Sequence, residues 1–243
     1  MTNAKRAEQK HQLSVLNVGE AVNDACQNAK SILEYAHATA SSLLGAYETI
    51  RGGRQSARGT TTDQEQDLLR AMLVMAAAGL DGMAKQLIRD TMKLLIARDE
   101  TVKKGLETFI YRQMRGDIDL PEVASRNKLL ARLLAAPSPQ GQAIEEYIRA
   151  LTGGSLQSAA EVLRIGRAFG LPPSDIGMDK ENESNVQKIF DIRNKIIHEL
   201  DMNLEGQQRK RNQRRVEDMK DYADRLLSIG VVLINKVSNK LAQ

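Results

Sequence analysis

The chain has 243 residues, a formal net charge of +4 and a single cysteine, Cys26. One cysteine excludes an internal disulfide framework and a cysteine-built zinc site, and it favours a reducing, cytoplasmic setting. Hydrophobic residues make up 42% of the chain and aromatic residues only 3%, which indicates a globular protein with a core of Leu, Ile, Met and Ala. The polar N-terminus and the lack of an unbroken apolar run of about 18 residues predict neither a signal peptide nor a membrane span.

Apolar residues recur every three or four positions along most of the chain, which is the period of an amphipathic helix. The first helix is expected over residues 7–50, either as one helix that packs on more than one neighbour or with a break near Gly19. The stretch 51–59 that follows is rich in Gly and Arg. It is interpreted as a solvated linker or as a flexible loop that contacts phosphate groups.

A second long helix is expected to extend to about residue 97, because residues 62–65 form a capping box ahead of an apolar run. Its middle, residues 76–82, consists of small residues that allow another helix to approach closely. Asp81 lies inside this tract and needs a basic partner. The candidates are Lys85, one turn further on, or an arginine from another helix.

Shorter helices are expected in the middle of the chain and two longer ones near its end. They cover roughly residues 102–114, 121–135, 143–151, 156–169, 182–204 and 207–240. Residues 158–176 faintly resemble a helix-turn-helix, so a DNA-binding regulator is an alternative, although two prolines lie at the turn. Without a strand-period segment or an internal repeat, the sequence predicts one all-α domain over residues 1–243, with an N-terminal extension and loop (1–60) and a core (63–240).

The strongest functional signal is an arginine, Arg193, followed five positions later by a histidine, His198, with Asn194 between them. The same spacing separates Arg6 from His11 in a polar segment, so the spacing alone is a weak signal. A helix turns about 100° per residue, which places Arg193 within an apolar arc. Asn194 and His198 then lie together at the edge of this arc.

This arrangement is suited to phosphodiester chemistry. Histidine exchanges protons near neutral pH, and arginine binds phosphate oxygens and the charge that develops as the bond breaks. His198 lies beside apolar side chains that a second subunit could cover. The alternative interpretation is structural, with a buried Arg193 paired to Asp81 or a neighbouring carboxylate and His198 as a surface residue.

Residues 193–198 resemble the signature of the HEPN superfamily (higher eukaryotes and prokaryotes nucleotide-binding domain). That signature is an arginine, a polar residue after it, and a histidine after four to six intervening residues. The position of the motif in the next-to-last helix is similar to that in the family, and so is the early apolar tract 73–81. The resemblance implies a HEPN-like helical bundle with a long N-terminal helix and additional short helices in the middle.

The resemblance also implies a metal-independent endoribonuclease that works as a homodimer without a cofactor. His198 would act as the base on the 2′-hydroxyl of RNA, Arg193 would hold the scissile phosphate, and Asn194 would orient it. The expected products are a 2′,3′-cyclic phosphate and a 5′-hydroxyl. Many such proteins are toxins held by an antitoxin partner, or anti-phage defence effectors. Others keep the fold without cleavage, so a non-catalytic module that binds RNA, a nucleotide or a protein is the alternative.

Five basic residues follow the motif helix and are expected to flank the cleft and contact an RNA backbone. They are Arg209, Lys210, Arg211, Arg214 and Arg215. The alternative is a solvated helix start, but a basic first turn opposes the helix dipole, which favours a partner for these charges. The scarcity of aromatic residues predicts little base stacking and a modest sequence preference.

Overall fold

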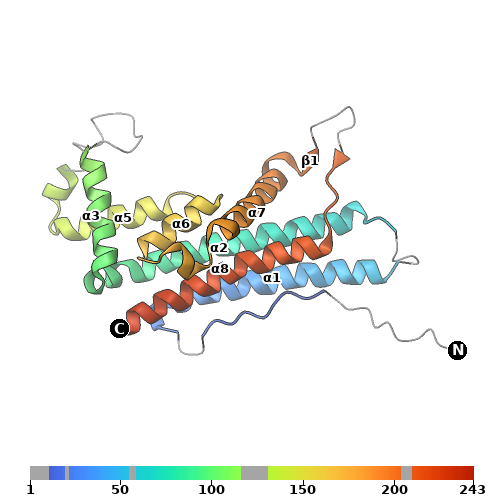
Figure 1. Ribbon diagram of the computed structural model, residues 1–243, viewed down its shortest axis with the longest axis horizontal. Coiled ribbons are helices and arrows are strands. Elements are labelled where there is room, and N and C mark those ends of the chain that lie inside the picture. The colour runs from blue at the N-terminus through green and yellow to red at the C-terminus, as the bar shows by residue number, and fades with distance from the viewer. Residues whose placement is uncertain (1–10, 20–21, 55–58, 116–130, 204–209) are drawn as a thin grey trace.

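The computed structural model describes residues 11–19, 22–54, 59–115, 131–203 and 210–243 (Figure 1). These residues form an all-α protein, as predicted from the sequence. Its elements are η1 (Asp24–Cys26), α1 (Gln27–Gly52), α2 (Asp63–Arg98), α3 (Glu100–Arg115), α5 (Pro139–Thr152), α6 (Ala159–Ala168), η2 (Pro173–Ile176), α7 (Lys180–Glu199), β1 (Met202–Asn203), β2 (Lys210–Arg211) and α8 (Val216–Ala242). Residues 131–135 are also helical, whereas the rest of the helix expected over 121–135 lies outside the described residues.

Helix α2 is the centre of the fold and contacts α1, α3, α5, α7 and α8. Figure 1 shows α1, α2 and α8 running side by side, with α3 and α5 gathered at one end. The predicted capping box begins α2: Thr62 Oγ1 accepts from the Glu65 amide at 3.2 Å, and Glu65 Oε2 accepts from the Thr62 amide at 2.8 Å. Both contacts satisfy amides that the first turn leaves free.

The small-residue tract of α2 lies against α1, as the sequence predicted. A Cβ atom at Gly79 would lie 2.0 Å from the Cβ of Ala36, and one at Gly82 would lie 3.4 Å from Ile32. Only a glycine at position 79 permits this approach of the two backbones.

Among the described helices, α2 is long and apolar enough to cross a membrane by length and composition. More than half of its apolar 18-residue window, 56%, is buried inside the protein. This burial is typical of the central helix of a helical bundle, where neighbouring helices cover the apolar surface.

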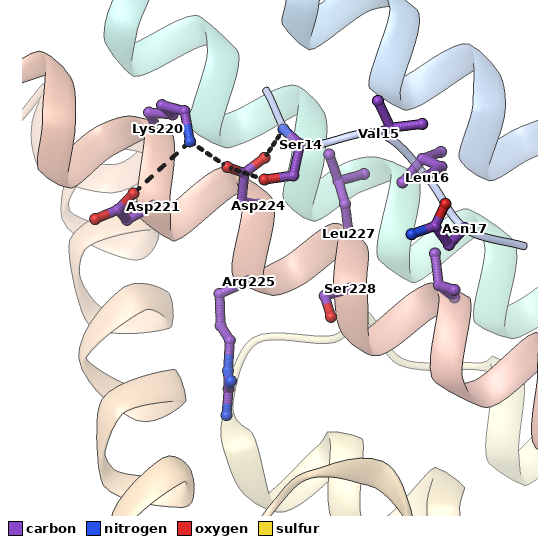
Figure 2. A pocket seen from close by; sticks show the side chains of 11 residues that line it. Ser14, Val15, Leu16, Asn17, Lys220, Asp221, Asp224, Arg225, Leu227 and Ser228 are labelled. Atoms are coloured by element: carbon purple, nitrogen blue, oxygen red, sulfur yellow. Dashed lines mark hydrogen bonds and ion pairs between the residues drawn. The ribbon is translucent and has the colours of Figure 1, made fainter. Parts of the chain in front are cut away.

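The expected N-terminal helix is wrong over its first part, because residues 11–19 are extended and α1 begins only at Gln27. Side chains of α8 hold this segment. Asp224 accepts from both the amide and the hydroxyl of Ser14, at 2.8 and 2.9 Å, as Figure 2 shows. Backbone groups that a helix would pair internally are therefore satisfied by distant side chains. Residues 7–10 lie outside the described residues.

The boundary between the last two long helices also differs from the prediction. Helix α7 ends at Glu199 and α8 begins at Val216. Strand β1 pairs with β2 in antiparallel register, with Met202 opposite Arg211. The first turn of α8 is acidic, with Glu217 and Asp218, and this agrees with the helix dipole.

The weak helix-turn-helix resemblance over residues 158–176 has no counterpart in the fold. Helix α6 is followed by η2, a single 3-10 turn of four residues, before the chain continues to α7. A second helix long enough to enter a DNA groove is absent from this described stretch.

Candidate functional site

Helix α7 carries the Arg–Asn–His motif on its last two turns. Asp179 caps its start by accepting from the Asn182 amide at 2.9 Å. Its apolar side packs against α2, α6 and α8. The buried side chains on that side are Val186, Ile189, Phe190 and Ile196. Because these contacts fix the helix, the motif has a defined position on the protein surface.

Arg193 is half-buried and donates from Nη1 to Asn194 Oδ1 at 2.9 Å. Its Nε is buried and has no hydrogen-bond partner within the described structure. Asp81, the structural partner considered from the sequence, is engaged elsewhere: it accepts from Lys85 Nζ at 2.7 Å and from the Leu156 amide at 2.8 Å. The Arg193 guanidinium therefore keeps a donor that no group of the described structure satisfies.

Asp81 and Asn194 anchor the loop between α5 and α6 at adjacent residues. Asp81 holds the amide of Leu156, and Asn194 Nδ2 donates to the carbonyl of Gln157 at 3.1 Å. Both ends of the Asn194 amide are thus used within the chain. Asn194 consequently fixes the orientation of Arg193 relative to the loop.

His198 lies in the last turn of α7 and is exposed. Two exposed apolar residues flank it, Ile197 at 41% and Leu200 at 67%. Leu200 also adopts a left-handed backbone conformation, with φ of 53°, which is unfavourable for a residue with a branched side chain. The imidazole is exposed to solvent, and so are the two apolar side chains next to it in the chain.

The basic residues after α7 divide into inward and outward groups. Arg211 Nη2 lies 2.6 Å from Asp67 Oδ1, and Arg214 binds Asp201. Lys210 is exposed, and the side chain of Arg215 is 74% exposed with its Nε 3.7 Å from Glu217. Arg209 lies outside the described residues. Lys210 and Arg215 are therefore the members of the set that face solvent.

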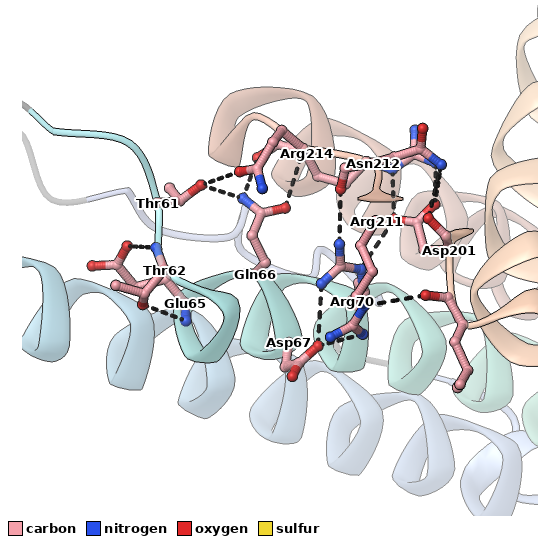
Figure 3. A network of polar contacts seen from close by, with 12 residues as sticks. Thr61, Thr62, Glu65, Gln66, Asp67, Arg70, Asp201, Arg211, Asn212 and Arg214 are labelled. Atoms are coloured by element: carbon pink, nitrogen blue, oxygen red, sulfur yellow. Dashed lines mark hydrogen bonds and ion pairs between the residues drawn. The ribbon is translucent and has the colours of Figure 1, made fainter. Parts of the chain in front are cut away.

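A buried polar network, which the sequence reading missed, follows the motif directly (Figure 3). Asp201 is fully buried and accepts from Arg70 Nε at 3.0 Å, from Asn212 Nδ2 at 3.0 Å, and from Arg214 Nε and Nη2 at 3.0 and 2.6 Å. Burial alone would raise the pKa of the Asp201 carboxyl, but the hydrogen bonds from Arg214, Asn212 and Arg70 outweigh it and lower that pKa below its ordinary value.

The sequence contained one usable signal for this network. Arg70 lies in the same helical row as Leu73 and Ala77, which are buried. A charged residue in an apolar row needs a buried acidic partner. Nothing in the local sequence identifies that partner as Asp201, which is 131 residues away.

Surface hollows occur away from the motif. One of about 480 Å³ lies between the extended N-terminal segment and α8, where Lys220 pairs with Asp224 at 2.6 Å and with Asp221 at 3.9 Å (Figure 2). Among the described residues, no cluster of three or more His, Cys, Asp or Glu is placed to hold a metal ion. Comparison with protein-family models, curated proteins and solved structures found no match to this chain. Function is therefore argued from the residues themselves.

Proposed function

We propose that this chain is a metal-independent endoribonuclease of the HEPN type, active as a homodimer. The observation that carries the proposal is the pairing, at the end of one helix, of an exposed His198 with an Arg193 whose buried Nε lacks a partner in the described structure. A proton-transferring group and an anion-binding group on the same helix end are the two elements that RNA cleavage by its own 2′-hydroxyl requires.

In the proposed reaction, His198 of one protomer removes the proton of the 2′-hydroxyl. The 2′-oxygen attacks phosphorus, the bond to the 5′-oxygen breaks, and the second His198 or water returns a proton to that oxygen. The products are a 2′,3′-cyclic phosphate and a 5′-hydroxyl. Arg193 donates to the phosphate oxygens, where a guanidinium stabilises the charge that accumulates during attack. Asn194 acts through Arg193, because its own amide is occupied within the chain.

The dimer is supported by the apolar surface around the motif. Ile197 and Leu200 expose their side chains on either side of His198, and a second copy placed against this surface would bury them. Such a face-to-face contact between identical surfaces brings the two His198 rings into one cleft. Lys210 and Arg215, which face solvent, are available to the RNA backbone on the rim.

The proposed biological role is that of a cytoplasmic toxin or anti-phage defence effector, held inactive by an antitoxin or regulatory partner. The alternative is a non-catalytic module that binds RNA, a nucleotide or a protein through the same surface. One observation favours this alternative. Asn194 holds the Gln157 carbonyl, and this structural role explains the residue without any catalytic activity.

The test is incubation of the purified protein with RNA in the presence of EDTA, followed by analysis of the new ends. The proposal expects cleavage that EDTA does not inhibit, with 2′,3′-cyclic phosphate and 5′-hydroxyl ends. Intact RNA, cleavage abolished by EDTA, or 5′-phosphate ends would overturn it. RNA that is bound but never cut would select the non-catalytic alternative.

A further inference from the structure

The chain turns sharply directly after His198, and the turn uses two unfavourable backbone conformations in succession. Leu200 and Asp201 have φ angles of 53° and 59°, a left-handed region that residues other than glycine rarely adopt. Both amides point back at the end of α7: the Asp201 amide donates to the Lys195 carbonyl at 3.1 Å, as does that of Leu200. Such a turn persists only where surrounding contacts over-determine it.

The surrounding contacts come from α2 and from the segment that leads into α8. Arg70 binds the Asp201 carboxylate from α2, and its Nη2 donates to the Asn212 carbonyl at 2.8 Å. The Asn212 amide donates to the Asp201 carbonyl at 2.9 Å. Arg211 Nε adds a hydrogen bond to the Leu200 carbonyl at 3.2 Å. Asp201 is thus tied through its side chain and its backbone, and Leu200 through its backbone.

Helix α2 also fixes the partner segment itself. The Gln66 side chain accepts from the Arg214 amide at 2.7 Å and donates to the Arg214 carbonyl at 2.9 Å. Figure 3 shows Gln66 and Arg70 reaching from α2 to the segment around Asn212 and Arg214, with Asp201 beside that segment. The end of α7 is therefore clamped to the central helix rather than left to fray as helix ends ordinarily do.

We propose that Asp201 is a positioning residue that holds the His198 imidazole in place through its contacts with Arg70 and Arg214. This inference rests on the proposed function, because His198 is the proton-transferring group there. Catalytic geometry tolerates little displacement, and His198 is exposed. Its position is consequently set by the backbone of α7, whose packed helix continues into the turn that Asp201 ties to α2.

The same geometry gives Arg214 a positioning role in place of a direct contact with RNA. Its guanidinium makes two contacts with Asp201 and its side chain is 19% exposed, whereas that of Arg215 is 74% exposed. Substitution of Arg214 is expected to lower kcat with little change in KM. Substitution of Arg215 is expected to raise KM with little change in kcat.

The test is the ring signals of the three histidines in NMR spectra of the wild type and Asp201→Asn. Asparagine keeps the shape of the side chain and tolerates the left-handed conformation, but it lacks the charge. The His198 signal, assigned with His198→Ala, is expected to shift or broaden. The His37 signal is the internal control, because that ring contacts the Ser14 carbonyl at 2.9 Å in another part of the fold, and it is expected to stay. In parallel, kcat for RNA cleavage is expected to fall by about tenfold or more at unchanged KM.

Each outcome bears on the proposal. An unmoved His198 signal in folded Asp201→Asn overturns it, whether or not RNA is cleaved, and so does a moved signal with wild-type kcat. A wild-type protein that leaves RNA intact rejects the proposed function, and the His198 signal then decides the positioning role alone. If Asp201→Asn does not fold, the His37 signal is lost too, and Arg214→Lys carries the same test because a lysine cannot make the two-point contact.

Discussion

Arg214 and Asp201 meet through two hydrogen bonds, from Nε at 3.0 Å and from Nη2 at 2.6 Å, across the turn that ends the motif helix. The Asp201 carboxylate is fully buried, and a second arginine, Arg70, also binds it, from α2. A buried charge is tolerated only when it is paired and hydrogen-bonded. The turn after His198 is consequently held by several hydrogen bonds to a buried charge.

Acidification is expected to release this turn. The pKa of Asp201 is lowered from its ordinary value of 3.8, so the ionised carboxylate stabilises the folded state above the unfolded pKa, and this contribution is lost as pH falls through the folded pKa. At pH 7, Asp201→Ala is expected to lower the free energy of unfolding by about 3–5 kcal/mol, since it leaves buried charges without a partner. Denaturant titrations at several pH values between about pH 5 and pH 3 measure how steeply the free energy of unfolding falls with pH. The variant should lose less stability on acidification than the wild type, and parallel curves would contradict the account.

Substitutions at Leu200 separate two effects: the strain of its left-handed backbone and the contribution of its side chain to a contact between subunits. Leu200→Gly removes a left-handed penalty of about 1–2 kcal/mol at an entropic cost of about 0.5–1 kcal/mol, so the single chain is expected to gain about 0.5–1 kcal/mol in stability. Leu200→Ala is the matched control, because it removes the same exposed side chain but keeps the strain. Both variants are expected to weaken the proposed homodimer in sedimentation experiments. Unchanged association in both would show that Leu200 is not part of a subunit interface.

Gly79 is expected to be the most restrictive position of the α1–α2 contact. Gly79→Ala places a Cβ 2.0 Å from that of Ala36, and separating the two helices is expected to cost about 1–3 kcal/mol. Gly45→Ala is the matched control in α1, where a Cβ would meet no atom within 4 Å. That substitution is expected to stabilise the helix by about 0.5–1 kcal/mol. Denaturant unfolding measures the change in the free energy of unfolding for both variants, which is expected to be of opposite sign. Equal changes would contradict the close approach of α1 and α2.

Local signals predicted the parts of the fold that depend on local chemistry. The capping box at Thr62 and the small tract around Gly79 are both present, because capping and close packing follow from residue types at fixed spacing. The extended segment 11–19 could not be predicted this way. Its apolar period resembles that of a helix, but its backbone is satisfied by Asp224 and Asn235, which lie more than 200 residues further along the chain.

In the candidate site too, local features could be predicted from the sequence and features that depend on distant contacts could not. The helical spacing of Arg193, Asn194 and His198 could be predicted from the sequence, since all three lie on one helix. The end of that helix could not be predicted from the sequence, because Leu200 adopts a left-handed conformation that its side chain disfavours. Contacts with Arg70, distant in sequence, are what make the turn possible. Tertiary hydrogen bonds thus end α7 at Glu199, before residue 204 where the sequence predicted its end.

The most direct test of the central claim compares RNA cleavage by His198→Ala and His11→Ala. His11 follows an arginine, Arg6, at the same spacing, so it is a matched control for the motif outside the proposed site. Loss of the proton-transferring group is expected to slow cleavage by His198→Ala by about 100-fold or more, while His11→Ala cleaves within about twofold of the wild type. Cleavage by folded His198→Ala at the wild-type rate would contradict the assignment.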